Sequence, residues 1–274
     1  MTEYAKYLRK NETPWCPGCG NGIVMKALCD AMNSLAWDMK NDVCVVSGIG
    51  CSGRMSSLME AYTLHSLHGR ALPMAEAIAR VHPNKHVIVI SGDGDGGSIG
   101  RSAFMQECNE NVDMTYIIVN NFTYALTKGQ SSPTTPVGTK AYMCPYGVYV
   151  RPFNLCELAI ASGATFVARG TTLDVLPLSK MIEAGCKHHG FSFIEVFSGC
   201  PENFGRKNGL RTSNDTRSWI DSLVFPKAKF DELSDEEKQG KYPTGILKRE
   251  HGVIEGNDAY AIHVEEARRL NGGE

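Results

Sequence analysis

Four cysteines lie where their thiolates could bind a metal ion or an iron–sulfur cluster. Cys16 and Cys19 form a Cys-Pro-Gly-Cys run, whereas Cys51 and Cys200 each follow an apolar stretch that predicts a buried strand. A cysteine pair at the first spacing serves as a redox dithiol, as half of a zinc site or as half of an iron–sulfur site. The four positions depart from the compact cysteine runs of ferredoxins, so their spacing alone leaves these alternatives open.

A second group of residues has the chemistry of a diphosphate and its cation. The run Gly92-Asp93-Gly94 follows one apolar stretch, and Asn120-Asn121 follows the next. Asp93 and Asn121 offer the side-chain oxygens that hard cations prefer, and glycines let backbone amides approach a phosphate. Gly-Asp-Gly alone is a common turn, but the asparagine pair favours a functional site. The combination resembles the thiamine diphosphate and magnesium motif, in which a backbone carbonyl, here that of Thr123, is the third protein ligand.

Alternating helices and buried strands must position these residues. Apolar residues recur at helical spacing from Asn21 to about Met39, and Val43–Val46 then form a short apolar run. This order repeats, which is typical of βαβ units with a mainly parallel sheet covered by helices on both faces. The predicted class is α/β. Further helices are expected at 73–81, 155–161 and 178–186, and further strands at 86–90, 114–119, 166–169 and 191–197.

The composition and the distribution of charged and apolar residues limit which domain organisations and which partners are possible. The 274 residues carry 28 Lys+Arg against 30 Asp+Glu, with the basic residues scattered, which argues against nucleic acid as a partner. Apolar runs are too short for a membrane span, so we expect a cytoplasmic protein whose ten cysteines stay reduced. Hydrophobic periodicity fades after Pro201. We therefore divide the chain into a catalytic domain, 1–200, and a C-terminal extension, 201–274, that packs on the domain or on a partner subunit.

The ordered motifs of the chain resemble those of the β subunits of 2-oxoacid:ferredoxin oxidoreductases. They are W-C-P-G-C-G at 15–20, G-I-G-C-S-G-R at 48–54, H-G-R-A-L-P at 68–73, G-D-G-D at 92–95 and N-N-F-T-Y-A-L-T-K-G-Q-S-S-P-T-T-P at 120–136, with Cys200 extending the match. Gly96-Gly97-Ser98 and Ala125 depart from the usual pattern, which concerns the shape of the pocket rather than the cofactor ligands. The resemblance implies the thiamine diphosphate-binding fold.

By this resemblance, one 4Fe-4S cluster close to the thiamine ring is bound by Cys16, Cys19, Cys51 and Cys200. Zinc in the same four thiolates is the alternative, because tetrahedral sulfur sites suit it as well. The other cysteines are expected to be small buried hydrophobic residues. They are Cys29, Cys44, Cys108, Cys144, Cys156 and Cys186.

The resemblance also implies roles around the cofactor and the substrate. Arg54 is expected to pair with the substrate carboxylate, since a guanidinium suits bidentate recognition, although a surface arginine is the alternative. Leu126 and Thr127 are expected to line the substrate pocket. Mg2+ would be held by Asp93, Asn121 and Thr123. The residues expected to bind or approach the cofactor are Cys51, His68, Gly92, Asp93, Gly94, Asp95, Asn121 and Thr123.

The implied reaction is the coenzyme A-dependent oxidative decarboxylation of a 2-oxoacid to an acyl-CoA and carbon dioxide. The carboxylate would leave as carbon dioxide because the thiamine ring acts as an electron sink, and the electrons would then pass singly through the adjacent cluster to ferredoxin. The glutamate that activates thiamine is expected on an α subunit, since Glu76, Glu107 and Glu110 fall on helical stretches and should be solvated. The chain should therefore require the α subunit, with or without further small subunits.

The run from Cys200 to Asn208 resembles members that act on 2-oxoglutarate. The second carboxylate of that substrate would need another cation, for which Arg206 and Lys128 are candidates. Pyruvate and branched-chain or aryl 2-oxoacids are the alternative substrates. A non-catalytic electron-transfer subunit is the alternative function, although the intact Asp93 and Asn121 argue against it.

Overall fold

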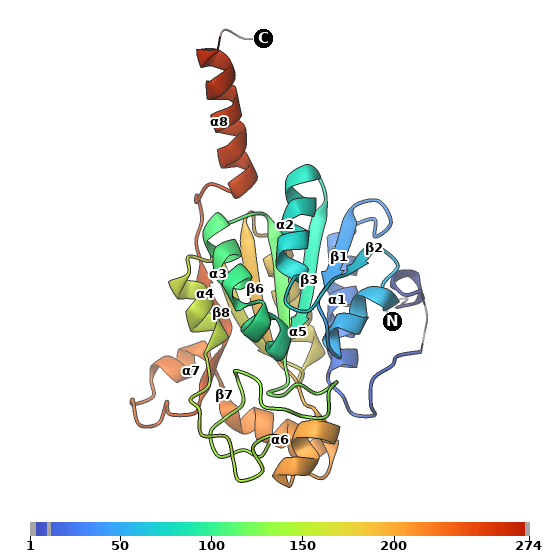
Figure 1. Cartoon of the computed structure of the whole chain (residues 1–274), viewed down its shortest axis with the longest axis vertical. Helices are drawn as coiled ribbons and strands as arrows, with labels where there is room; N and C mark the ends of the chain where they lie inside the picture. The colour runs from blue at the N-terminus through green and yellow to red at the C-terminus, as the bar shows by residue number, and fades with distance from the viewer. Residues whose placement is uncertain (1–3, 10–11, 272–274) are drawn as a thin grey trace.

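A single sheet of eight strands, in the order β2-β1-β3-β4-β6-β5-β8-β7, forms the centre of the protein (Figure 1). Each neighbouring pair is parallel except β5 and β8, which are antiparallel. The structure, a computed structural model, describes residues 4–9 and 12–271. Residues 1–3 and 10–11 of the predicted catalytic domain, and residues 272–274 of the predicted C-terminal extension, lie outside these ranges. Helices cover both faces of the sheet, so the predicted α/β class is confirmed.

The strands are β1 (Val43–Ser47), β2 (Tyr62–His65), β3 (His86–Gly92), β4 (Met114–Asn120), β5 (Phe166–Thr171), β6 (Phe191–Phe197), β7 (Val224–Pro226) and β8 (Tyr242–Arg249). The helices are α1 (Asn21–Leu35), α2 (Ala71–Val81), α3 (Arg101–Glu110), α4 (Leu155–Ala161), α5 (Val175–Cys186), α6 (Ser213–Leu223), α7 (Lys227–Asp231) and α8 (Gly256–Leu270). Short 3-10 helices are η1 (Tyr4–Tyr7), η2 (Ser52–Leu58) and η5 (Arg206–Asn208), and short π-helices are η3 (Asp95–Ile99) and η4 (Pro201–Gly205).

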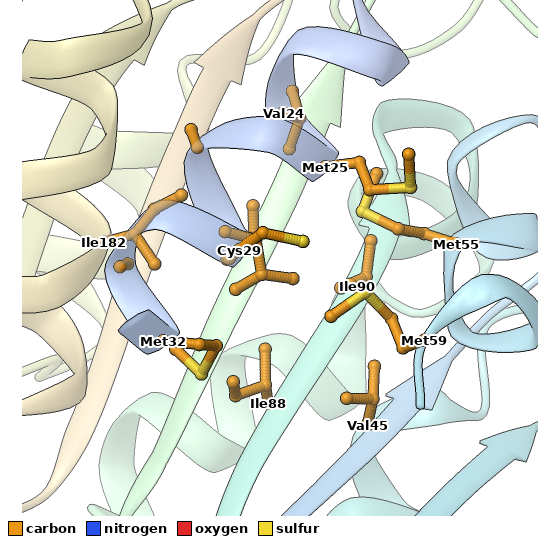
Figure 2. Packing of buried hydrophobic residues seen from close by; sticks show 14 of the residues in the cluster. Val24, Met25, Cys29, Met32, Val45, Met55, Met59, Ile88, Ile90 and Ile182 are labelled. Carbon is orange, nitrogen blue, oxygen red and sulfur yellow. The ribbon is translucent and has the colours of Figure 1, made fainter. Parts of the chain in front are cut away.

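The central strands are apolar throughout because both faces of the sheet are buried. All residues of β1, β4 and β6 are buried, and successive side chains along each strand enter opposite cores. On one face, α1, α5 and η2 pack on residues such as Val45, Ile88 and Ile90 (Figure 2). On the other face, α2, α3 and α4 pack on residues such as Val46 and Val89. The two cores fix the register that aligns the strand ends.

The carboxyl ends of β1, β3, β4 and β6 meet at one edge of the sheet, which is the lower edge in Figure 1. Each strand is followed there by a residue of chemical interest. Cys51 lies beyond β1, Asp93 beyond β3, Asn121 beyond β4 and Cys200 beyond β6. Parallel strands bring such loops together, and ligands in open α/β sheets bind at this edge.

The C-terminal segment continues the same sheet. Strand β8 pairs with β5, and β7 pairs with β8. Helix α6 lies at the lower edge, where Ile220 and Trp219 join an aromatic cluster with Phe122 and Phe204. Helix α8 projects from the upper end of the molecule in Figure 1. The segment beyond residue 200 supplies two strands of the sheet, β7 and β8, as well as the projecting helix α8. The division of the chain at residue 200 stays a prediction.

Three expectations about local structure were wrong in whole or in part. The first helix ends at Leu35 rather than near Met39, because Ala36 adopts a left-handed conformation with φ of 55° and ends the helix. Glu107 is buried at 1% exposure instead of solvated, because it lies on the side of α3 that faces the core. Of the cysteines expected to be buried, Cys144 and Cys186 are partly exposed and the others are buried.

Within the described residues, none of the helices combines the length and the apolar character needed to cross a bilayer.

Candidate active site

Asp93 and Asn121 lie together at the carboxyl edge of the sheet, as predicted. The backbone N–H of Asn121 is 3.4 Å from Asp93 Oδ1, and the hydroxyl of Thr134 is 2.9 Å from Asp93 Oδ2. Asp93 is buried at 1% exposure. Burial raises the pKa of Asp93 to about 6, although hydrogen bonds from Ser132 and Thr134 act in the opposite direction. A buried carboxylate of this kind is suited to a cation, which would compensate for its lost hydration.

The turn after β4 is built by its two asparagines. Asn120 Oδ1 accepts the N–H of Phe122 at 3.0 Å, and Asn121 Oδ1 accepts the N–H of Thr123 at 3.3 Å. Asparagine side chains stabilise such turns by bonding the backbone two residues on. Phe122 has a left-handed φ of 61°, and its ring packs against Phe197. These contacts hold Asn121 and Thr123 in the cavity beside Asp93.

This first cavity contains all the residues predicted to bind or approach thiamine diphosphate. It is lined by Ile49, Gly50, Cys51, Ser52, His68, Gly92, Asp93, Gly94, Asp95, Asn121, Thr123, Tyr124, Ala125, Leu126 and Thr127. Gly94 is required sterically, because a Cβ at this position would collide with the ring of Tyr124. Ser52 and Tyr124 are further lining residues that sequence reasoning missed, although both fall inside the motifs at 48–54 and 120–136.

Asp95 and His68 are paired at the wall of the cavity. His68 Nδ1 lies 2.7 Å from Asp95 Oδ1, and the same oxygen accepts the N–H of Gly69 at 2.6 Å. The other oxygen, Asp95 Oδ2, accepts the hydroxyl of Ser91 at 2.9 Å. The carboxylate of Asp95 therefore fixes the loop that carries His68, and it approaches the cofactor site as a wall residue.

The four predicted cysteines also come together. Cys16, Cys19, Cys51 and Cys200 line a second cavity. Burial, together with the nearby sulfurs of Cys19 and Cys200, raises the pKa of the Cys51 thiol to about 11. The indole of Trp15 donates to the carbonyl of Cys51 at 2.7 Å, which ties the N-terminal loop to the loop after β1. Four thiols around one cavity are a ligand set for an iron–sulfur cluster or zinc, and binding such a metal would hold them as thiolates.

The two cavities adjoin each other. Their shared lining residues are Cys51, Asn121, Ala125 and Leu126. A group bound beside Asp93 is therefore separated from a group bound by the cysteines by little more than these side chains. Such proximity is what electron transfer between two cofactors requires.

Arg54 lines the cysteine cavity, Thr127 lines the first cavity and Leu126 lines both. Arg54 is exposed and lines the cysteine cavity together with Lys128. Leu126 is 41% exposed and lines both cavities. The hydroxyl of Thr127 donates to Gln130 Oε1 at 2.7 Å. Their roles toward a substrate stay predictions.

Comparisons with known proteins agree with this geometry. Residues 48–196 match the family model described as "Thiamine pyrophosphate enzyme, C-terminal TPP binding domain". The chain is 43% identical over 245 residues to the 2-oxoglutarate synthase subunit KorB of Methanocaldococcus jannaschii, covering 88% of this chain and 89% of that protein. The chain belongs to the 2-oxoacid:ferredoxin oxidoreductase β-subunit family. Its members are subunits of oxidoreductases, and the thiamine-binding domain is present in this one.

Two further relatives extend the family match. The 2-oxoacid:ferredoxin oxidoreductase subunit beta of Saccharolobus solfataricus is 40% identical over 246 residues, covering 85% of this β subunit and 76% of that protein. The solved 2-oxoglutarate:ferredoxin oxidoreductase from Magnetococcus marinus superposes with a TM-score of 0.86 at 32% identity, covering 99% of this chain and 91% of that chain. That structure has 2-oxoglutarate, coenzyme A and succinyl-CoA bound. The predicted fold family is therefore confirmed.

The match to the thiamine-binding domain includes Asp93, Asn121 and Cys51 but not the other cysteines. It begins after Cys19 and ends at residue 196, before Cys200. The cysteine cavity of this β subunit is thus assembled mainly from segments on either side of the thiamine-binding domain.

Proposed function

We propose that this β subunit belongs to a 2-oxoglutarate:ferredoxin oxidoreductase. The reaction would convert 2-oxoglutarate and coenzyme A to succinyl-CoA and carbon dioxide, with the released electrons passing to ferredoxin. The observation that carries the proposal is the solved relative with 2-oxoglutarate, coenzyme A and succinyl-CoA bound, whose fold covers nearly this whole chain. The relatives named 2-oxoglutarate synthase subunits, at 39–43% identity, support the same substrate.

The cavity beside Asp93 fits the diphosphate end of thiamine diphosphate and its Mg2+. Asp93, Asn121 and the backbone carbonyl of Thr123 would hold the cation, since all three supply oxygen ligands. Gly92 and Gly94 would let the backbone approach the phosphates. When bound, the thiazolium ring would supply the electron sink for decarboxylation. The residues of this chain would bind and orient the cofactor, with Leu126 and Tyr124 excluding water around it.

The cysteine cavity fits a 4Fe-4S cluster bound by Cys16, Cys19, Cys51 and Cys200. Its adjacency to the thiamine cavity supports this proposal, because a redox-active group there would be placed to accept electrons. Zinc would satisfy the same four thiolates but could not take up electrons. The chemical role of the cavity therefore favours the cluster.

Two cationic residues of the cysteine cavity would be available to a dicarboxylate substrate bound in the adjoining thiamine cavity. Arg54 and Lys128 both line the cysteine cavity, so two cations are available near the shared wall. Arg206, the other candidate from the sequence, instead pairs with Glu202, with 2.9 Å between its Nη2 and Glu202 Oε1. We therefore assign the two carboxylates of 2-oxoglutarate to Arg54 and Lys128 rather than to Arg206.

An α subunit is the expected partner, because relatives of this length are named as one subunit of an enzyme. The loop between β4 and α4 supports this expectation. Tyr142, Met143, Tyr146 and Tyr149 are all more than 60% exposed there. Large apolar side chains gathered at a surface are typical of protein–protein contacts. The partner would complete the enzyme around the thiamine cavity.

The proposal is tested with the chain co-expressed with its α subunit and purified without oxygen. Reduction of a viologen dye, and then of ferredoxin, is followed with coenzyme A and either 2-oxoglutarate, pyruvate, a branched-chain or an aryl 2-oxoacid. We expect 2-oxoglutarate to give the highest kcat/KM, and succinyl-CoA as the product. A preference for another acid would correct the substrate. Turnover with none of them, despite bound thiamine diphosphate and iron, would instead support an electron-transfer subunit.

A further inference from the structure

A chain of buried hydrogen bonds leads from Asp93 into the sheet. Thr134, in the loop after β4, places its Oγ1 2.9 Å from Asp93 Oδ2 and 2.9 Å from Asn120 Oδ1. Asn120 Nδ2 donates to Glu195 Oε1 at 2.8 Å, and Glu195 Oε2 accepts from Arg169 Nε at 2.7 Å. All five residues are at most 2% exposed. Water is therefore excluded from the back of the Asp93 carboxylate.

The direction of each hydrogen bond is set by the partners. Asn120 Oδ1 accepts the N–H of Phe122, and its Nδ2 faces a carboxylate, so the amide has only one possible orientation. Thr134 thus lies between two acceptors and has one proton to donate. The charged oxygen of Asp93 is the stronger acceptor. The hydroxyl of Thr134 therefore donates to Asp93 Oδ2.

The neighbouring hydroxyls leave this arrangement intact. Thr135 donates to the carbonyl of Phe122 at 2.7 Å and accepts the backbone N–H of Ser132 at 2.7 Å. The hydroxyl of Ser132 lies 3.1 Å from Thr134 Oγ1 and 3.2 Å from Thr135 Oγ1, and it also interacts with Asp93. Thr134 Oγ1 is thus held between Asp93, Asn120 and Ser132, which together restrict its rotamer.

The two oxygens of Asp93 differ as a result. Oδ2 holds the strong bond from Thr134, whereas Oδ1 has the N–H of Asn121 at 3.4 Å, which is longer than an ordinary N–H···O bond. We propose that Thr134 is a positioning residue that fixes the Asp93 carboxylate so that Oδ1 is available to the Mg2+ of thiamine diphosphate. This inference rests on the proposed cofactor site. Hydrogen bonds of this kind to a metal ligand set its orientation and the affinity of the site.

The test measures the Mg2+ dependence of thiamine diphosphate binding by the α–β complex after its cofactor and metal have been removed with a chelator. Thr134→Val keeps the shape but leaves Asp93 Oδ2 without a donor. We expect it to raise the half-saturating Mg2+ concentration at least 10-fold, the scale typical of such contacts. Thr134→Ser restores the hydroxyl and should stay within about threefold of the wild type. Thr165→Val, a buried threonine that bonds Asn111 away from the site, is the matched control and should leave binding unchanged.

Wild-type Mg2+ dependence in a folded Thr134→Val complex would overturn the assignment. Equal losses in Thr134→Ser and Thr134→Val would also overturn it. Only Thr134→Ser keeps the hydroxyl, so equal losses would mean that the hydroxyl has no role. If Thr134→Val does not fold by circular dichroism, Thr134→Ala is held to the same criterion. Failure of the wild-type complex to bind thiamine diphosphate at any Mg2+ concentration would reject the proposed cofactor site itself, which separates the two conclusions.

Discussion

Arg169 of β5 and Glu195 of β6 lie opposite each other in the parallel register and form a buried ion pair, with 2.7 Å between Nε and Oε2. Both side chains are about 1% exposed. Arg169 also stacks its guanidinium near the rings of Phe197 and Tyr242, at 5.3 and 5.1 Å from their centroids. The pair therefore joins the parallel core of the sheet to β8, which supplies Tyr242.

Glu195→Gln is expected to destabilise the protein by about 3 kcal/mol, because it leaves the buried charge of Arg169 without its partner. Urea unfolding of the purified chain measures this change. Glu183→Gln, which removes the surface pair with Lys187, is the control and should cost less than about 1 kcal/mol. Equal effects of the two substitutions would contradict the stabilising role assigned to the buried pair.

Cys200→Ser is expected to abolish most of the bound iron and the visible absorption of the complex, since one of four thiolate ligands is lost. Metal analysis of the wild type should find iron rather than zinc. Cys144→Ser changes a partly exposed cysteine outside the cavity and should leave both measurements unaltered. Unchanged iron in the Cys200 variant would remove this residue from the ligand set.

Gly94→Ala is expected to weaken thiamine diphosphate binding at least tenfold, or about 1.4 kcal/mol, because the new Cβ displaces the ring of Tyr124 from the cavity wall. Isothermal titration of the α–β complex at saturating Mg2+ reports the dissociation constant. Gly22→Ala in α1 is the control, because a Cβ there meets nothing within 4 Å. Wild-type affinity in the Gly94 variant would show that the wall does not constrain the cofactor.

Glu107 predicts a pH dependence of stability. Burial raises its pKa to about 9, and the negative charge of Glu76 adds to the rise, while Arg80 opposes it. The folded state therefore holds a proton that the unfolded chain loses above its ordinary pKa near 4.5. Folding stability falls as the pH rises from about 4.5 toward 9, by at most about 1.4 kcal/mol per pH unit.

Glu107→Gln removes this titration, so its free energy of unfolding should gain on that of the wild type as the pH increases from 6 to 8.5. Urea unfolding at both pH values measures the difference. Glu236→Gln, at an exposed position, should show no such gain. A wild type and a Glu107 variant with parallel pH profiles would mean that the carboxyl ionises normally in the folded protein.

The positions of Asp93, Asn121, Cys51 and Cys200 could be predicted because each follows an apolar run, and parallel strands end at one edge. Their convergence needs only the class of the fold. The role of Thr134 could not be predicted, because its two acceptors come from the ends of different strands. The quoted motif at 120–136 contained Thr134, but nothing in the spacing says which hydroxyl meets Asp93.

The buried charged residues could not be predicted from the sequence either. Arg169 and Glu195 each interrupt an apolar strand, which is a signal, but only the register between β5 and β6 makes them partners. Glu107 stands among polar neighbours on a short helix with little amphipathic contrast, so its burial could not be inferred from periodicity. Sequence patterns locate elements and their ends; pairings across elements depend on the three-dimensional register.

The residues of the cysteine cavity come from segments before and after strands β1 to β6 in the sequence. Cys16 and Cys19 precede α1, and Cys200 follows β6. When residue 197 has been synthesised, strands β1 to β6 are complete but only three of the four thiols are present. Stable cluster insertion would have to wait until Cys200 emerges. Iron loading would then mark the completion of synthesis of the catalytic part of the chain.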